Sequence, residues 1–554
     1  MDDSTATIEA LSLEAKVGQL LHVGIGLSHL ETGTEWPDEG MKTVIEEIQP
    51  GAVRVYGSHA VTPHFMAQYA NRLQQWATRT SHGIPLLLSC DCEYGAVDIV
   101  EHGTRAYPAL MGRTAAGDLD LARDVSAAVA RDMLAMGLNT SHQPVVDVNT
   151  NPDNPVIGVR SPGSDPETVS EYATAALDGI HATNQIAVAK HFPGHGDTAE
   201  DSHHELPHVT YDRETLERVH LPPFETMIEE GVDCLMTSHI VVDCLDPDLP
   251  ATLSRTVLSD LLRDDLGFDG VVVTDAMMMD AIADNYGVGE AAVRALDAGV
   301  DLLLTGYVPA TDLREMRDAI VDAVTSGDIR ESRIDESVER ILALKDAYDL
   351  SERRHVDPLE ALETTGSKAH ESIAAAAYER SYTVLDDADV LPLPDDADVL
   401  LTGIRGVRSL EPRLDAAFGD VIGRSLAPSD GRALDDPKPP IEPESLDTRL
   451  ETLRSIADAV DIAVVTTYTR EEFPDGQRRV VDALSDALPV VVVSLGLPNE
   501  YERLPDDIAY VATYAQDRLG MPEPIPETAG RALVTVLGRE TKPRESLPLE
   551  RQSR

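Results

Sequence analysis

The sequence GVVVTDAMMMDAIADNYGVGEAAVRALDAGVDLLLTG, residues 270–306, holds two short apolar runs, GVVVTDA and VDLLLTG, on either side of a helix-length segment. The same alternation extends back to residue 17. Apolar, β-branched runs joined by helical patterns are typical of a parallel sheet with crossover helices. The other six runs are VGQLLHVGIG from Val17, GAVRVYG from Gly51, IPLLLSCDCE from Ile84, HQPVVDV from His142, IAVAKHFPGH from Ile186 and VDCLMTSHI from Val232. Eight strand and helix pairs predict a (β/α)8 TIM barrel.

The rest of the sequence predicts a second, smaller α/β domain. Beyond residue 370, five apolar runs (SYTVLD, ADVLLTGI, DIAVVTTYT, LPVVVVSLGLP and IAYVATYA) are separated by helical or loop segments, as in a three-layer α/β/α sandwich. The polar stretch SERRHVDPLEALETTGSKAH precedes them and is typical of a join between domains. We therefore expect the barrel in residues 1–350, a linker in 351–370 and the sandwich in 371–554.

Acidic residues outnumber basic ones in every part of the chain. With 98 Asp and Glu against 45 Lys and Arg, the formal net charge is -53. Such a charge repels phosphate backbones and anionic lipid surfaces, so we expect no nucleic-acid partner and no membrane partner. The bases are mostly Arg, which together with scattered acids favours a halophilic protein over an ordinary acidic one. In molar salt the Debye length falls to roughly 3 Å, and the self-repulsion is screened.

The N-terminal sequence and the cysteines bear on the compartment. MDDSTATIEALSLEAK lacks the basic and apolar regions of a signal peptide, and no later apolar run approaches the ~18 residues of a membrane span, so we expect a cytoplasmic protein. Cys90, Cys92, Cys234 and Cys244 are too few and too loosely spaced for a disulfide framework or a four-thiolate zinc site. We expect Cys90 and Cys92 to be thiols on opposite faces of a strand, in or near the core.

Ionisable residues gather where the predicted barrel strands end. The carboxyl ends of parallel barrel strands meet at one mouth, and strands buried on both faces are otherwise apolar. The residues at these ends are Asp91, Glu93, Asp147, Lys190, His191, His239 and Asp275. Any one of them alone is as readily an ordinary loop residue. Their shared placement predicts a functional site at the mouth.

The densest polar segment is AKHFPGHGDTAEDSHHELP, residues 189–207, which predicts a long Gly-rich loop after the fifth strand. One hypothesis is a zinc site, because His191, His195, His203, His204 and Asp201 are zinc-ligand types. The spacings match no H-E-x-x-H or paired Cys/His pattern, so we expect no metal. The alternative is proton transfer, with Asp201 orienting the His203 imidazole and Asp275 acting as a nucleophile. An acid/base facing a nucleophile is the equipment of double-displacement glycoside cleavage.

The sequence resembles glycoside hydrolase family 3, and within it the β-N-acetylglucosaminidase branch. KHFPGHGDTAEDSH, from Lys190 to His203, is similar to the K-H-F-P-G-H-G-x(4)-D-S-H signature of that branch. Further similar segments are NPDNPVIGVRS, DPDLPATLS, GFDGVVVTDAMMMDAI, VVVVSLGLPNEY and KPRESLPL. The resemblance covers nearly the whole chain and implies a barrel followed by a three-layer sandwich.

The resemblance also implies roles for particular residues. Asp275 would attack the anomeric carbon and form a covalent glycosyl-enzyme, and His203, paired with Asp201, would protonate the leaving oxygen and then deprotonate water. The residues implied to hold the substrate are Asp91, Arg160, Lys190 and His191, and His239 at the end of the sixth strand is a further substrate-binding candidate. The family needs no metal or other cofactor. The expected partner is a small carbohydrate, a β-N-acetylglucosaminide, and no protein partner is predicted.

The match departs from the family pattern in two places. After the third strand the branch reads D-x-E-G-G-R-x-x-R, whereas this chain has DCEYGAVDI, with Tyr94, Ala96 and Ile99 in place of a glycine and two arginines. The G-E-R-S turn reads GVRS, with Val159 before Arg160.

Three alternatives stay open beside an exo-acting β-N-acetylhexosaminidase. They are a β-glucosidase or β-xylosidase, a phosphorylase, and a sugar-binding homologue without turnover. Phosphorolysis is considered because histidine, unlike a carboxylate, does not repel an approaching phosphate.

Overall fold

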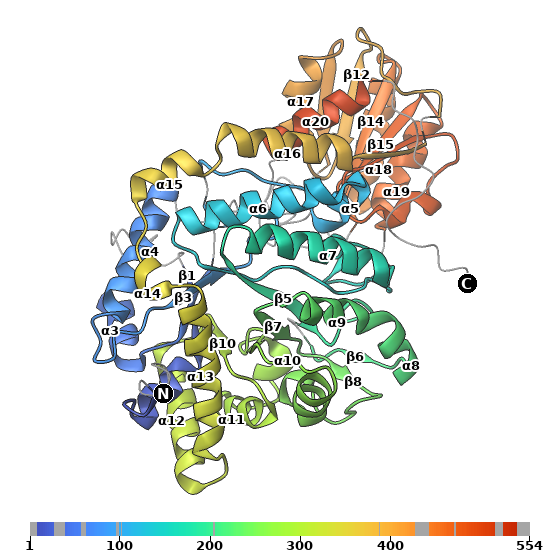
Figure 1. The fold of residues 1–554 in the computed structure, drawn as a ribbon. Helices are drawn as coiled ribbons and strands as arrows, with labels where there is room; N and C mark the ends of the chain where they lie inside the picture. Colours follow the sequence, from blue (N-terminus) through green and yellow to red (C-terminus); the bar gives the residue numbers. More distant parts are fainter. Residues whose placement is uncertain are drawn as a thin grey trace. The chain divides into compact units, whose positions relative to one another are not determined.

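The computed structural model describes residues 8–26, 39–56, 62–95, 99–100, 102–202, 205–386, 388–426, 443–469, 473–515 and 525–539. The chain divides into two compact units. The barrel unit comprises Met1–Arg105, Ala122–Val148 and Pro166–His370, and the sandwich unit comprises Ala106–Leu121, Asn149–Asp165 and Glu371–Arg554. The second unit therefore contains two segments from the first third of the chain as well as the C-terminal part. In Figure 1 these two segments have the blue and cyan colours of the early chain.

Eight parallel strands form the barrel, in the order β10-β1-β2-β3-β4-β5-β7-β9. A parallel bridge between Val273 and Leu302 joins the two ends of this order. The strands are β1 (Leu21–Gly26), β2 (Ala52–Tyr56), β3 (Leu87–Cys90), β4 (Thr140–Ser141), β5 (Ile186–Phe192), β7 (Cys234–Thr237), β9 (Val271–Thr274) and β10 (Leu303–Gly306). The prediction of a (β/α)8 barrel is confirmed.

The fourth strand differs from its sequence prediction. HQPVVDV from His142 was expected to form it, but regular pairing is confined to β4, just before His142. Pro144 has no N–H to donate to a strand ladder, which explains why regular pairing stops there. Pairing resumes only as an isolated bridge between Val145 and Lys190.

Helices alternate with the barrel strands. Thr62 caps α4, since its hydroxyl accepts from the backbone N–H of Phe65 at 3.2 Å and Pro63 occupies the first turn. The longer helices are α3 (Glu39–Ile48), α4 (Pro63–Ala77), α6 (Leu119–Ala135), α7 (Pro166–His181), α9 (Pro222–Glu229), α11 (Val288–Ala298), α12 (Ala310–Ser326) and α13 (Glu331–Ala347), with the π-helical segment η6 (Thr256–Asp265) before β9. α14 (Leu350–Arg353), α15 (Pro358–Thr364) and α16 (Lys368–Ser381) follow.

A buried carboxylate organises the amino-terminal end of the barrel. Asp301 lies just before β10, its side chain is fully buried, and its oxygens accept from the backbone N–H of Val272 at 3.0 Å. Three guanidinium groups lie against it, at 2.6 Å for Arg263, 3.3 Å for Arg333 and 3.2 Å for Arg340. This end of the barrel is held by ion pairs, whereas the carboxyl end carries the candidate site.

The sandwich unit contains a six-stranded sheet in the order β11-β16-β15-β14-β12-β13. All neighbouring pairs are parallel except β11 with β16. The strands are β11 (Thr383–Asp386), β12 (Val399–Gly403), β13 (Val421–Ser425), β14 (Ile462–Thr467), β15 (Val490–Ser494) and β16 (Ala509–Ala512), and the helices are α5 (Leu110–Ala116), α17 (Val407–Asp415), α18 (Pro443–Ala457), α19 (Asp475–Ser485) and α20 (Glu527–Leu537). Five of these strands match the predicted apolar runs. The sixth, β13, is a half-exposed edge strand whose sequence has no apolar pattern to detect.

The structure corrects the prediction for two cysteines. Cys90 and Cys92 were expected to be thiols on opposite faces of a strand, but they form a disulfide bond. Side chains alternate between the two faces of a sheet only while the strand continues. Here β3 ends at Cys90, and Cys92 has a left-handed backbone, with φ of 47°. The turn brings the two side chains to the same side, and Asp91 lies between them.

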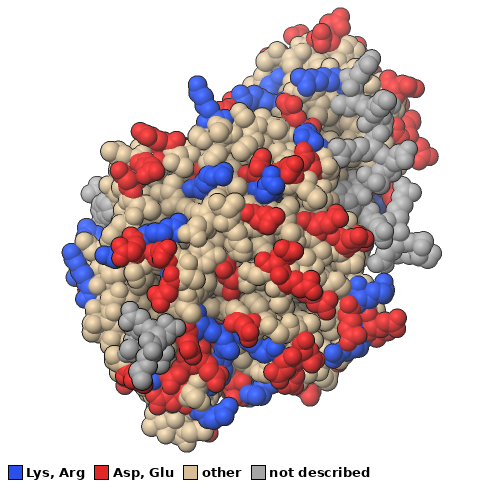
Figure 2. Space-filling model, viewed as in Figure 1, with Lys and Arg blue, Asp and Glu red and all other residues tan. Residues whose placement is uncertain are grey.

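Charge is spread over the face of the molecule that Figure 2 shows. Figure 2 shows carboxylates over most of the visible face, with Lys and Arg among them and no single acidic patch. Across the residues that the structure describes, no helix combines the length and the apolar character needed to cross a membrane.

Candidate active site at the carboxyl ends of the barrel strands

Lys190 is the centre of a group of charges on neighbouring strands. It lies in β5, its side chain is 2% exposed, and its ammonium group is 2.9 Å from Asp91 Oδ1 and 2.7 Å from Glu93 Oε1. The other oxygen of Asp91 pairs with the guanidinium group of Arg54, in β2. Burial opposes ionisation of Asp91, but the charges of Arg54 and Lys190 hold the pKa of this carboxyl well below its usual range. Asp91 is therefore a carboxylate at neutral pH.

His142 is a neutral member of the same group. It is fully buried, and Nδ1 lies 3.6 Å from Asp91 Oδ1. Burial lowers the pKa of His142 to about 4, despite the nearby carboxylate. The charged members of the group are thus Arg54, Lys190, Asp91 and Glu93.

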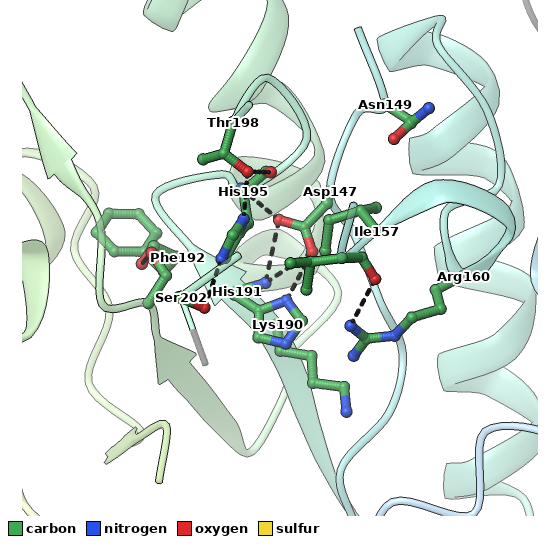
Figure 3. Close-up of polar contacts among 12 residues, drawn as sticks. Asp147, Asn149, Ile157, Arg160, Lys190, His191, Phe192, His195, Thr198 and Ser202 are labelled. Atoms are coloured by element: carbon green, nitrogen blue, oxygen red, sulfur yellow. Dashed lines mark hydrogen bonds and ion pairs between the residues drawn. The ribbon is translucent and has the colours of Figure 1, made fainter. Parts of the chain in front are cut away.

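Asp147 holds the end of β5 and the start of the loop that follows (Figure 3). Its fully buried carboxylate accepts from His191 Nδ1 at 2.7 Å and from the backbone N–H of His195 at 2.6 Å. Burial opposes ionisation, but the neighbouring His191 and these hydrogen bonds lower the pKa of Asp147. A carboxylate on one ring nitrogen orients an imidazole and fixes which nitrogen faces the site.

His195 connects the two ends of the predicted catalytic loop. Thr198 Oγ1 donates to the backbone oxygen of His195 at 3.1 Å, so it accepts from His195 Nδ1 at 2.9 Å. We assign the proton to Nδ1 on this basis, and Nε2 then accepts from Ser202 Oγ at 3.0 Å (Figure 3). Burial lowers the pKa of His195 to about 4, consistent with a neutral ring. The bond to Ser202 lies next to Asp201, a predicted catalytic residue.

Asp275 follows β9 and is partly buried, with Oδ1 accepting from the backbone N–H of Ala276 at 2.7 Å. This bond orients the carboxylate at the rigid end of a strand. His239 lies beside it and is fully buried. Its Nε2 contacts the backbone oxygen of Ala276 at 3.1 Å, and its Nδ1 is 2.8 Å from Thr252 Oγ1. These contacts tie His239 to the segment that carries Asp275, and its role as a substrate contact stays a prediction.

The remaining predicted site residues are placed as follows. Asp201 is partly buried, and its backbone oxygen accepts from Glu205 N at 3.1 Å. His203 and His204 lie outside the described residues. Arg160 lies in the short helix η3 (Gly158–Arg160) of the sandwich unit, where its guanidinium group donates to the Val156 backbone oxygen at 3.1 Å.

Two residues of the barrel mouth were missed from the sequence. Arg54 and Tyr56 are both on β2, and the guanidinium carbon of Arg54 lies 4.1 Å from the centre of the Tyr56 ring. The signal was present, because an arginine in the apolar strand AVRVY requires a buried partner. We searched for site residues only after the ends of the strands, and Arg54 lies within one. No cluster of at least three His, Cys, Asp or Glu suited to a metal ion occurs within the described ranges.

Comparison with known proteins identifies the family. Residues 12–344 match the glycosyl hydrolase family 3 N-terminal domain. The chain belongs to glycoside hydrolase family 3. The match spans the barrel strands and every predicted site residue, from Asp91 to Asp275.

Individual family 3 proteins are similar over different lengths. A solved β-N-acetylglucosaminidase from Paenibacillus sp. str. FPU-7 is 33% identical, with a TM-score of 0.83 over 98% of this chain and 99% of that chain. Beta-hexosaminidase A of Pseudoalteromonas piscicida is 30% identical over 388 residues, which are 66% of this chain and 64% of the relative. Beta-hexosaminidase LpqI of Mycobacterium tuberculosis is 36% identical over 273 residues, which are 47% of this chain and 68% of the relative. This chain thus spans slightly less than two thirds of the Pseudoalteromonas relative.

Proposed function

We propose that this chain is a retaining exo-β-N-acetylhexosaminidase that removes terminal β-linked N-acetylglucosamine. The observation that carries the proposal is the likeness to the Paenibacillus β-N-acetylglucosaminidase, which extends over 98% of the chain. The barrel mouth supports it, since it holds a strand-end carboxylate, a buried Lys–carboxylate group and an oriented histidine in one unit.

In the proposed first step, a carboxylate oxygen of Asp275 attacks the anomeric carbon and forms a glycosyl ester. The bond to the leaving oxygen breaks as His203 gives that oxygen a proton. In the second step, His203 takes a proton from water, the water oxygen attacks the anomeric carbon, and the ester bond breaks to restore the Asp275 carboxylate. Asp201 supports the imidazolium form of His203, which is present before the first proton transfer and is restored by the second.

The group around Lys190 would hold the glycone. Asp91 retains 35% of its side-chain surface, whereas Lys190 retains 2%. A partly exposed carboxylate can accept hydrogen bonds from sugar hydroxyls, and its buried partners keep it in place. His191 is oriented by Asp147 and is the second glycone contact in this proposal. For Arg160, the sugar contact that the resemblance implies stays a prediction.

The test is hydrolysis of p-nitrophenyl glycosides in potassium chloride buffer. We expect cleavage of the N-acetylglucosaminide to exceed that of the glucoside and xyloside, and Asp275→Asn to lose at least about 10³-fold in kcat. Asp284→Asn is the matched control, because Asp284 is exposed and close in sequence. Near wild-type turnover by Asp275→Asn would show that the nucleophile is assigned wrongly.

The same assay separates the other functions. A glucoside preference would place the chain with the β-glucosidases. Release of a sugar 1-phosphate that depends on added phosphate would show a phosphorylase. Binding of N-acetylglucosamine with no cleavage of any glycoside would show a sugar-binding homologue.

A further inference from the structure

Arg54 is a buried cation in the middle of a barrel strand. It retains 12% of its side-chain surface, and its neighbours in register are Gly24 in β1 and Ser89 in β3. Both neighbours are small, which leaves room inside the barrel for a long side chain. At Gly24 a Cβ would lie 2.2 Å from the Gly306 backbone oxygen and 2.8 Å from a carbon of the Tyr56 ring, so only a glycine fits beside this ring. The interior of the barrel thus accommodates Arg54 and the ring against which it stacks.

The contacts of Arg54 converge on Asp91. Its terminal nitrogen pairs with Asp91 Oδ2, and its guanidinium carbon lies over the Tyr56 ring, 4.1 Å from the ring centre. Asp91 Oδ1 is occupied by Lys190 at 2.9 Å. Two cations on two different strands therefore hold the two oxygens of one carboxylate, which fixes its rotation.

Exposure separates the members of this group. Arg54 and Lys190 retain 12% and 2% of their side-chain surface, whereas Asp91 retains 35%. Asp91 is therefore the member that a ligand can reach, and the two cations support it from within the barrel.

The charge balance of the group depends on Arg54. Asp91 and Glu93 both contact the ammonium group of Lys190, and Arg54 adds a second cation beside Asp91. With Arg54 present, two cations face two carboxylates. Asp275 lies close enough for its charge to favour the ionised form of Arg54. Without Arg54, the Asp91 carboxylate would keep the ammonium group of Lys190, which it shares with Glu93, and the neutral His142.

We propose that Arg54 is a positioning residue that fixes Asp91 for glycone binding, and that it thereby sets the selectivity of the site for the sugar hydroxyl that Asp91 holds. The role rests on the proposed function in one respect, namely that the ligand is a sugar. This role differs from general structural support. Loss of Arg54 should weaken only the contribution of the sugar hydroxyl that binds Asp91, and not the contributions of the other hydroxyls.

The test compares N-acetylglucosaminides that lack one hydroxyl at a time, at the 3-, 4- or 6-position. In the wild type, removing the hydroxyl held by Asp91 should lower kcat/KM roughly 10- to 100-fold, as expected for a hydrogen bond to a charged group. In Arg54→Met, which keeps an unbranched side chain but loses the guanidinium group and its charge, the same removal should cost less than about 3-fold. Arg54→Lys, which keeps the charge, should recover most of the selectivity.

Arg333→Met is the matched control. Arg333 is also a buried arginine paired with an aspartate, but it lies against Asp301 at the other end of the barrel. It should lower stability and leave the ratio between parent and deoxy substrates unchanged. If Arg54→Met behaves as Arg333→Met does, or if no deoxy substrate is disfavoured by the wild type, the proposal is wrong.

Failure of the proposed function gives a different result. If the wild type cleaves no aryl glycoside, the same comparison is made by calorimetry with N-acetylglucosamine and its deoxy forms. A selectivity that collapses in Arg54→Met then supports the role of Arg54 in sugar binding without hydrolysis. Absence of binding to any of these sugars overturns it.

Discussion

His195 accepts a hydrogen bond from Ser202 through Nε2, at 3.0 Å, while its backbone N–H donates to the buried Asp147 at 2.6 Å. The loop after β5 is thereby closed on itself seven residues along the chain. Since Asp201 precedes Ser202, we predict that His195→Ala loosens the proposed acid/base pair and lowers kcat about 10- to 100-fold with little change in KM. Steady-state kinetics on the aryl N-acetylglucosaminide measure this.

Two comparisons sharpen this prediction. Ser202→Ala removes the same bond without opening a large cavity, so it should reproduce part of the loss in kcat. Burial holds the pKa of His195 at about 4, below the ~6.5 of the unfolded chain, so the neutral ring costs stability as pH falls from 6.5 to 4. The free energies of unfolding of wild type and His195→Ala, measured in urea, should therefore converge as the pH falls from 6.5 to 4. A His195→Ala enzyme with unchanged kcat would contradict the proposed role of the loop.

Lys345 leads to a prediction about how the stability of the fold changes above pH 7. Its side chain is 2% exposed, its ammonium group donates to Gln19 Oε1 at 2.9 Å, and burial lowers its pKa to about 7. The unfolded chain, with a lysine pKa of ~10.4, binds more protons between these values, so stability rises with pH by up to about 1.4 kcal/mol per unit. Lys345→Met should lose this rise, measured by urea unfolding at pH 7, 8 and 9.

Lys16→Met is the control for Lys345. Lys16 is also buried, but it pairs with Glu331 at 2.9 Å and Asp335 at 2.7 Å, and these partners raise its pKa despite burial. Its titration therefore lies above the measured range, and the Lys16→Met variant should keep the wild-type slope between pH 7 and 9. Equal slopes in wild type and Lys345→Met would refute the assignment.

Asp301 should be essential to the stability of the barrel. Asp301→Asn leaves the guanidinium groups of Arg263, Arg333 and Arg340 without their shared carboxylate, which is typically worth about 3–5 kcal/mol for a buried pair. Asp297→Asn removes the exposed pair with Arg255 and should cost at most about 1 kcal/mol. Chemical denaturation of both variants measures the difference, and a loss below about 1 kcal/mol for Asp301→Asn would show that the cluster is dispensable.

Sequence patterns predicted the barrel because its strands are buried on both faces and read as apolar runs. β13 was missed because an exposed edge strand has no such run. The strand-end rule found Lys190 and Asp275, but it could not find Arg54, whose position in mid-strand depends on the small neighbours Gly24 and Ser89 on other strands. Spacing along one strand also could not predict the Cys90–Cys92 disulfide, which depends on a turn. Pairings between strands are the information that a single sequence lacks.

The excess of acids predicts that salt stabilises the fold. Net charge is -53, and the carboxylates are dispersed over the visible face in Figure 2, so self-repulsion on that face is not confined to one patch. Between 0.1 and 1 M potassium chloride the Debye length falls from about 10 to 3 Å, and the thermal midpoint should rise steeply over this range and then level off. Sucrose stabilises by exclusion without screening, so it should produce a gradual rise with no plateau. A thermal midpoint that does not change with potassium chloride concentration would mean that neighbouring Arg side chains already neutralise the acids locally. The halophilic interpretation of the composition would then be wrong.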